Sequence, residues 1–238
     1  EEGLAYFCGY LNHYIGDSIC HPYVYGRIGY DAKASNSQAH GRHAALENDI
    51  DAILLWKYKH KKPSQFNQAA TICLNGMETQ FISRFLAECI NEAYYPITYS
   101  NNFQVTPSMI HRSILALRFG CRTLADPKGS KRNKIAFVEK LVLKNPVASQ
   151  KLVTDEINNP REVLNINHDI WCNPWDRRLA SRASFPDLFR QCLHKSSNVY
   201  AIINSYLTGE LPNTKESMDR LLDELGSYSY HSGLHVED

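Results

Sequence analysis

The stretch "GYLNHYIGDSICHPYVYG", from Gly9 to Gly26, carries the pattern that decides the fold. It contains one acidic residue, Asp17, and no Lys, Arg or Glu, and its other residues are largely apolar or aromatic. A helix that is apolar nearly all round is expected to be buried. A buried carboxylate without a partner costs several kcal/mol or takes up a proton. The sequence therefore raises the question of which positive charge balances Asp17.

Two histidines flank Asp17 at helical spacing. His13, Asp17 and His21 follow one another at intervals of four residues, so at about 100° per residue they fall within an arc of about 80°. We expect this helix to run from Glu1 to about Cys20 and to end before Pro22. A divalent metal ion bound by two imidazoles would supply the charge that Asp17 lacks.

A second predicted helix, from about His40 to Tyr58, repeats the arrangement with His43, Glu47 and Asp51. The loop between the two helices is short enough for an antiparallel pair. The side chains of the inner pairs are then expected to face one another around metal: His13, Asp17, His43 and Glu47.

Each pair has a simpler interpretation when it is taken alone, because His and a carboxylate one helical turn apart commonly form a hydrogen-bonded pair. Both pairs together, separated by one loop, favour metal. Asp51 fits a surface acid or a neighbour of the ligands equally well, and His40 is more typical of an exposed helix N-terminus. Mixed imidazole and carboxylate ligands suit Zn²⁺, with Mn²⁺ or Fe²⁺ as alternatives.

The remaining chain has mainly helical periodicity, which predicts an all-α fold in a single domain over residues 1–238. A polar loop is expected over Tyr30–Gln38, an irregular segment over Val147–Pro174, and a packed loop around Trp171 and Trp175. His231 is not assigned to the site. Further helices are expected from about Phe66 to Ala93, from Thr106 to near Asp126, over Ser184–Leu207 and over Thr214–Leu225.

Composition narrows the class of protein. The 238 residues carry 26 basic and 25 acidic side chains, a formal net charge of +1, which argues against a strongly basic nucleic-acid surface. The basic run Lys57–Lys62 is more typical of a solvated helix end than of a phosphate or membrane patch. There is no apolar run long enough to cross a membrane. Seven cysteines, an odd number with no CxxC spacing, favour reduced thiols and a cytoplasmic rather than a secreted location.

The stretch quoted first, followed by "HAALENDID" at 43–51, resembles the zinc-dependent phospholipase C family, whose relatives include the S1/P1-type nucleases. The strong resemblance covers roughly residues 4–55. A weaker one extends to His168–Asp176, Ser184–Phe189 and Ser227–Leu234, segments typical of bacterial, mostly uncharacterised members. The resemblance implies an all-α phospholipase C/P1 nuclease-like domain with a trinuclear zinc site, and for this chain we expect one to three zinc ions. It places the metal ligands at His13, Asp17, His21, His43 and Glu47.

Two differences from the family pattern bear on these expectations. In the well-known secreted enzymes the histidine after the aspartate lies beyond the helix end, whereas His21 follows Asp17 after only three residues. The family's other ligands and its general base precede this segment. Because the chain starts at Glu1, without Met and already inside a helical pattern, we expect upstream sequence to carry them.

The resemblance implies hydrolysis of a phosphodiester, with a phospholipid as the first substrate and a small phosphodiester as an alternative. A non-catalytic metal-binding or interaction domain that retains part of the site is the competing interpretation. A di-metal phosphohydrolase would need a His-Asp doublet on a helix, and the doublet His168–Asp169 lies in the predicted loop. The sequence does not indicate the oligomeric state.

Overall fold

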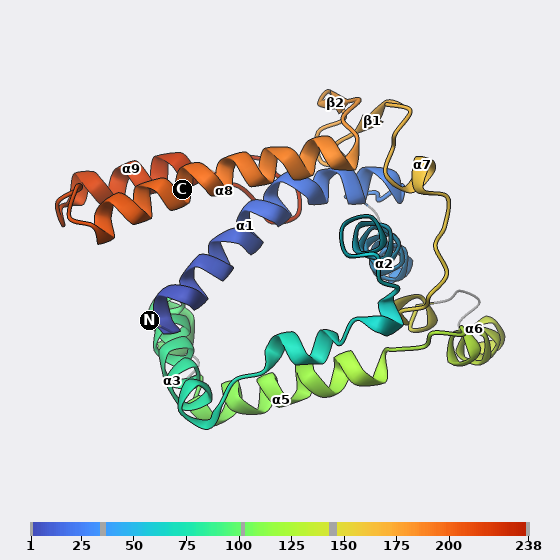
Figure 1. The fold of residues 1–238 in the computed structure, drawn as a ribbon, viewed down its shortest axis with the longest axis horizontal. Coiled ribbons are helices and arrows are strands. Elements are labelled where there is room, and N and C mark those ends of the chain that lie inside the picture. The colour runs from blue at the N-terminus through green and yellow to red at the C-terminus, as the bar shows by residue number, and fades with distance from the viewer. Residues whose placement is uncertain (1, 34–36, 101–102, 143–146, 237–238) are drawn as a thin grey trace.

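The computed structural model describes residues 2–33, 37–100, 103–142 and 147–236, which form helices and one small antiparallel hairpin (Figure 1). The prediction of an all-α fold is confirmed. The elements are α1 (Glu2–Arg27), α2 (Ser37–Lys59), the 3₁₀ turns η1 (Pro63–Gln65) and η2 (Gln68–Ile72), α3 (Gly76–Ala93), α4 (Tyr95–Ser100), α5 (Pro107–Thr123), α6 (Ser130–Val142), η3 (Ser149–Lys151), α7 (Pro160–Val163), β1 (Trp171–Cys172), β2 (Ala180–Ser181), α8 (Phe185–Leu207) and α9 (Lys215–Leu225).

The first helix is longer than predicted. The expectation that Pro22 ends it is wrong, because α1 continues through Pro22 to Arg27. A proline inside a helix costs about 3 kcal/mol through a lost hydrogen bond and a crowded carbonyl. The two residues that follow offset this cost, since Tyr23 is fully buried, Val24 is 2% exposed, and each such side chain contributes about 1.5–3 kcal/mol. The Tyr23 hydroxyl also donates to the backbone oxygen of Val163 at 2.6 Å.

Two apolar clusters share α1. The first joins the C-terminal half of α1 to α2, the start of α8 and the hairpin, and the second joins its N-terminal half to α8 and α9. The first consists of Tyr23, Val24, Ile50, Ile53, Leu164, Trp171, Phe185 and Leu188. The second consists of Leu11, Ile15, Cys192, Val199, Ile203, Leu221 and Leu225. The loop with Trp171 packs onto the domain as expected.

The predicted helix from about Phe66 to Ala93 is wrong in its first part. Two 3₁₀ turns occupy residues 63–72, and α3 begins only at Gly76. Asn75 starts it, because its side chain accepts a hydrogen bond from the Glu78 amide while the Glu78 carboxylate accepts one from the Asn75 amide. The later helices agree with prediction, with Thr106, Ser184 and Thr214 as their N-caps.

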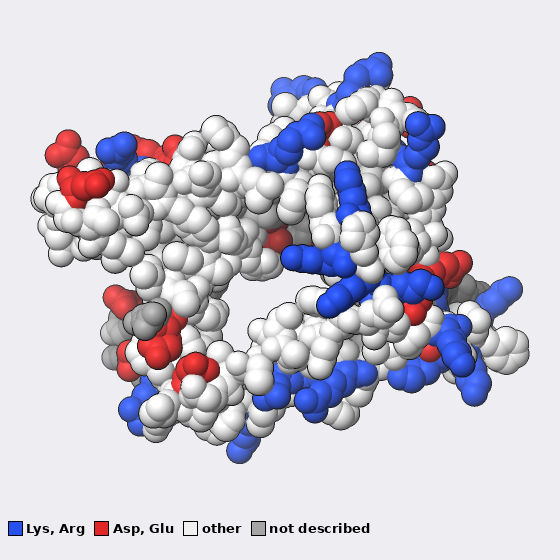
Figure 2. Space-filling model, in the orientation of Figure 1, with Lys and Arg blue, Asp and Glu red and all other residues white. Residues whose placement is uncertain are grey.

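The helices surround an opening in the molecule. Figure 1 shows α1, α3, α5 and α2 arranged in a ring, and the space-filling view retains an opening there (Figure 2). The accessible surface is 15776 Å², whereas a compact monomer of this mass exposes about 10,900 Å². The expectation that α1 is buried all round is therefore wrong for its first ten residues, where Tyr6, Phe7 and Tyr10 are 37%, 38% and 49% exposed.

Helix α6 was not among the predicted helices, and one buried carboxylate ties it to η3. Glu139 is 6% exposed. It accepts hydrogen bonds from the amides of Val147, Ala148 and Ser149 and, at 2.6 Å, from the Ser149 hydroxyl. Burial opposes ionisation of this carboxyl, but the hydrogen bonds outweigh it and lower the pKa of Glu139.

Replacing Glu139 by Gln should lower the free energy of unfolding at pH 7 by about 1.5–3 kcal/mol, because donors lose a charged acceptor. The pKa of Glu139 in the folded state is lower than the ordinary value of 4.5. The Glu139 carboxylate therefore stabilises the folded state fully above pH 4.5, and this stabilisation is lost as the pH falls through the pKa of the folded state. The free energies of unfolding of the Glu139→Gln variant and of the unaltered chain, measured in urea, should therefore become equal in acid. A difference in the free energy of unfolding that does not change with pH would contradict this prediction. So would an equal loss of stability in the control Lys140→Gln, which changes the neighbouring exposed residue.

Candidate metal centre

Helix α2 crosses α1 instead of running antiparallel to it. In Figure 1, α1 lies in the plane of view while α2 is seen nearly end-on beside the C-terminal half of α1. His13 and His21 are eight residues apart, about 12 Å along a helix axis. A helix that crosses α1 can therefore contact only one end of the row His13–Asp17–His21. Helix α2 contacts the end that carries His21.

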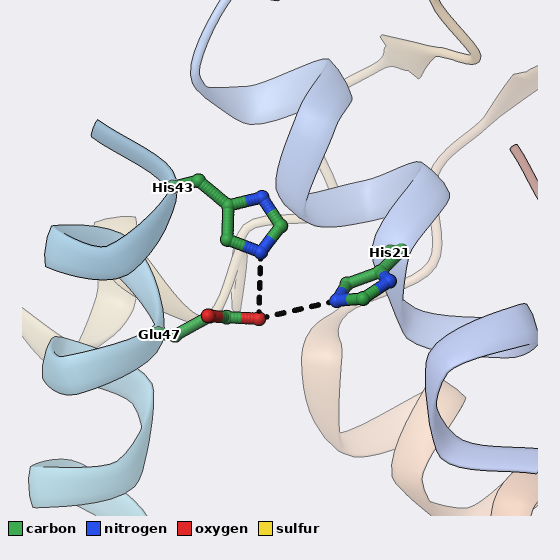
Figure 3. A group of neighbouring side chains, drawn as sticks. All are labelled: His21, His43 and Glu47. Carbon is green, nitrogen blue, oxygen red and sulfur yellow. Dashed lines mark hydrogen bonds and ion pairs between the residues drawn. The ribbon is translucent and has the colours of Figure 1, made fainter. Parts of the chain in front are cut away.

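The side chains of His21, His43 and Glu47 converge where the two helices cross (Figure 3). One carboxylate oxygen, Glu47 Oε1, lies 2.9 Å from His43 Nε2 and 3.2 Å from His21 Nε2. One donor atom from each of the three residues lies within 4.8 Å of the others. Among the described residues, this is the group of three or more such side chains close enough to hold one ion.

The C-terminal segment fixes which nitrogen of His21 carries the proton. His21 Nδ1 lies 2.5 Å from the backbone oxygen of Tyr230. A carbonyl oxygen only accepts hydrogen bonds, so Nδ1 must donate. In neutral His21 the lone pair is then on Nε2, directed at the carboxylate of Glu47, which is repulsive unless a cation lies between them or the ring takes a second proton.

The charges in the cluster support one another without metal. Burial opposes ionisation of Glu47, but the hydrogen bonds from His21 and His43 outweigh it and lower its pKa to about 2. Burial also opposes the charge on His21, and the contacts with Glu47, the Tyr230 carbonyl and Asp17 outweigh it and raise the pKa of His21. His43 Nδ1 is buried and has no hydrogen-bond partner among the described residues.

Asp17 and His13 adjoin the cluster without joining it. Asp17 Oδ2 lies 3.8 Å from His21 Nδ1 and 3.4 Å from His13 Nε2. The His13 side chain is 65% exposed and that of Asp17 is 22% exposed. Burial, partly opposed by the charges of His21 and His13, raises the pKa of Asp17. The two histidines are therefore the nearest positive partners of Asp17, and its role as a metal ligand stays a prediction, as does that of His13.

The two outer candidates differ. His40 is exposed at the start of α2, as the sequence suggested. Asp51 lies one turn after Glu47 and lines a cleft with it. The surrounding protein atoms reduce the hydration of the Asp51 carboxylate, and the negative charge of Glu47 opposes its ionisation. Together they raise the pKa of Asp51 to about 6. Asp51 is thus a carboxyl of the site's surroundings, outside the three-residue cluster.

The donors at the cluster fit a zinc ion. Two histidines and one glutamate, with a position left for water, form a ligand set of catalytic zinc sites. A histidine nitrogen and a glutamate oxygen that bind one tetrahedral zinc ion lie about 3.3–3.5 Å apart. The distances from Glu47 Oε1 to Nε2 of His43 and of His21, 2.9 and 3.2 Å, are within about 0.6 Å of this separation. The Tyr230 carbonyl on Nδ1 is the kind of partner that orients a metal-binding histidine.

A glycine positions the segment that carries Tyr230. Gly233 has a positive φ of 61° and closes a turn by donating its amide to the Ser229 oxygen. A Cβ at Gly233 would lie 2.4 Å from the backbone oxygen of Ser18 and 2.7 Å from Pro22 Cγ. Only glycine lets this turn seat against the proline-interrupted part of α1.

Sequence reasoning did not place Tyr25 at the cluster, and it favoured positions away from the cluster for Trp175 and His231. The ring of Tyr25 lies 4.6 Å from that of His43 and 5.0 Å from that of Trp175. Its hydroxyl lies 3.1 Å from His231 Nδ1, and the His231 ring stacks 6.1 Å from that of His21. Tyr25 follows His21 by four residues, a spacing that would have placed it on the same helical face.

A cleft of about 1120 Å³ opens from the cluster between α1, α2 and α8. Its lining includes both ionisable and apolar side chains. The ionisable residues include His13, Asp17, His21, Glu47 and Asp51, and the apolar ones include Val24, Leu54, Phe185, Phe189 and Leu193.

These features define a helical protein with a His–His–Glu candidate metal centre beside a cleft. The sequence model of the family described as zinc-dependent phospholipase C matches residues 2–95, the region that carries every predicted ligand. The match covers less than half of the chain, so the similarity to the zinc-dependent phospholipase C family is a similarity of this region. No curated protein and no solved structure matches the chain.

Replacing Glu47 by Gln should weaken zinc binding by more than tenfold, because the shared oxygen ligand loses its negative charge. Zinc should correspondingly raise the melting temperature of the Glu47→Gln protein less than that of the unaltered chain. Isothermal titration and thermal melts with zinc and with EDTA provide the measurements.

Asp49→Asn is the matched control, because Asp49 lies on the same helix and instead accepts a hydrogen bond from Asn158 at 2.8 Å. An equal loss of zinc affinity in both variants would contradict the assignment of Glu47. In the same titration, a loss of more than about 100-fold in Asp17→Asn would assign Asp17 as a ligand, because residues that only orient a ligand typically cost 10–100-fold.

Replacing Gly233 by Ala should cost at least about 1–2 kcal/mol, the cost of the left-handed conformation alone. The clash with Ser18 and Pro22 should also move the Tyr230 carbonyl away from His21. We therefore expect lower stability together with weaker zinc binding, measured by urea unfolding and by titration. Gly209→Ala, at a glycine with φ of 78° and open space around it, is the control that should lose stability only.

Proposed function

We propose that the protein is a zinc-dependent hydrolase of phosphodiesters whose substrate is a phospholipid or a related phosphodiester. The observation that carries the proposal is the convergence of His21, His43 and Glu47 beside a cleft with both ionisable and apolar walls. The match of residues 2–95 to the zinc-dependent phospholipase C family supports the same chemistry. Among the described residues, no helix is long and apolar enough to cross a membrane.

The chain's own residues supply binding and orientation. The backbone oxygen of Tyr230 keeps the His21 proton on Nδ1, so that Nε2 is available as a ligand. Glu47 and His43 supply the other two donor atoms from α2. A zinc ion held there would lower the pKa of a bound water to about 7 and offset charge on the phosphate oxygens. His13 and Asp17 remain predicted ligands, and one to three ions remain the predicted number.

The cleft wall suits a substrate with a charged and an apolar part. A phosphate group would lie at the His–His–Glu end, and an apolar chain would lie along Phe185, Phe189 and Leu193 of α8. Asp51 lines the same cleft outside the three-residue cluster, and hydrolysis requires a group that accepts a proton from water and is not itself a metal ligand. These features favour a phospholipid over a fully polar phosphodiester.

Replacing His43 by Ala should abolish most hydrolysis. The loss should exceed the 10–100-fold that is typical for residues that only orient a ligand. The measurement uses phosphatidylcholine vesicles and bis(p-nitrophenyl) phosphate, with zinc and with EDTA. Release of diacylglycerol and phosphocholine identifies cleavage at the phospholipase C position.

His40→Ala, which removes an exposed histidine one turn earlier on α2, is the matched control and should leave the rate unchanged. A chain that binds zinc at His43 and Glu47 but hydrolyses neither substrate would overturn the proposal in favour of a non-catalytic metal-binding domain. Equal rates in zinc and EDTA would overturn it as well.

A further inference from the structure

Basic charge is concentrated in residues 107–142, the segment that holds α5 and α6. This segment has eight Lys and Arg against two acids, a net charge of +6, whereas the whole chain has +1. Both acids point inward, since Asp126 is 4% and Glu139 6% exposed. Figure 2 shows Lys and Arg side chains along the edge of the molecule formed by α5 and again around α6. The exposed charges of this segment are therefore basic.

Helix α5 mixes these charges with exposed apolar side chains on one face. Arg112, Leu115, Phe119 and Arg122 are spaced by three, four and three residues, which places them within an arc of about 80°. Leu115 is 49% and Phe119 68% exposed. The helix has no fully buried residue, although it packs along one side against α3 and η2.

Helix α6 repeats the combination. Lys134, Phe137, Val138 and Leu141 are spaced by three, one and three residues and share one face. Phe137, Val138 and Leu141 are 66%, 57% and 70% exposed. The opposite side of the helix carries Glu139, whose buried carboxylate binds η3. We name the four residues of α5 and these four of α6, each set on one face of its own helix, the basic-apolar face.

The charge of this face selects among the partners that would cover apolar side chains. A second copy joined by a twofold axis would set the same basic surface against itself, with repulsion between the two. A nucleic acid would match the charge, but the aliphatic Leu115, Val138 and Leu141 do not stack with bases. An anionic lipid surface matches both properties, because basic side chains pair with its headgroups while apolar ones enter the boundary of the acyl chains.

We propose that the basic-apolar face docks the protein on the surface of an anionic lipid bilayer. This surface lies outside the metal centre and outside the region matched by the family, and its role does not depend on hydrolysis. It also accounts for part of the surface by which the chain exceeds a compact monomer of its mass.

The test measures sedimentation of the full chain with vesicles in EDTA, so that hydrolysis plays no part. Vesicles of phosphatidylcholine alone are compared with an equal mixture of phosphatidylcholine and phosphatidylserine. We expect binding to the mixed vesicles only, weakening as salt is raised. Neutralising one basic side chain at such a surface weakens binding by about fivefold, so Arg112→Gln with Lys134→Gln should weaken it by about 25-fold. Phe119→Ser with Phe137→Ser should also weaken it.

Helix α9 provides matched controls, because it exposes Met218 and Leu222 at 54% and 55% beside acidic residues. Met218→Ser with Leu222→Ser, and Lys215→Gln with Arg220→Gln, should leave binding unchanged. Circular dichroism establishes that each variant is folded.

Three results would overturn the proposal. The first is equal binding to both vesicle types or to neither. The second is a dimer in analytical ultracentrifugation that the substitutions on the basic-apolar face dissociate, which would assign the face to a second copy. The third is binding of single-stranded RNA that is lost in the same variants while vesicle binding is kept. Because the assay contains EDTA, its outcome is separate from the test of hydrolysis.

Discussion

The close approach of Gly233 to α1 is the contact that seats the C-terminal segment against the candidate metal centre. It lies against the Ser18 carbonyl and Pro22, where the helix has no room for a side chain on the opposing segment. The turn seated there directs the Tyr230 carbonyl at His21. Proline thus has two roles in α1: it removes a hydrogen bond within the helix, and it marks the place where a distant segment attaches. Residues more than two hundred positions apart in sequence become one site.

The charge balance of the centre is local and made mostly of histidine. Glu47 shares one oxygen between two imidazoles, which outweighs the burial that opposes its charge. Asp17 has histidines on both sides, and burial still raises its pKa. Without metal, the contact between His21 and Glu47 stabilises the fold only while both ring nitrogens of His21 carry a proton. A cation there would relieve the repulsion between the His21 lone pair and the Glu47 carboxylate, so ligand binding and folding are linked at this crossing of helices.

The architecture explains how a protein with balanced composition has a strongly basic region. Two apolar clusters on α1 hold α2, α8 and α9, while α5 and α6 contact the rest through one side only. The net charge of +1 hides a segment of +6. Composition argued against a strongly basic surface for nucleic acid, but it carried no information on how charge is distributed over the folded molecule.

Sequence reasoning predicted the helical class and a row of potential ligands on each of two helices, because both follow from spacing along one helix, and it predicted the N-cap Thr106 from the proline that follows it. It did not determine which end of the row on α1 meets α2. The crossing of the helices decided that, and it brought His21 rather than His13 beside His43 and Glu47. The continuation of α1 through Pro22 also depended on tertiary structure, because the burial of Tyr23 and Val24 outweighs the local cost of proline. The partners Tyr230 and Gly233 were beyond sequence reasoning, since their role is a contact across the chain and not a local pattern.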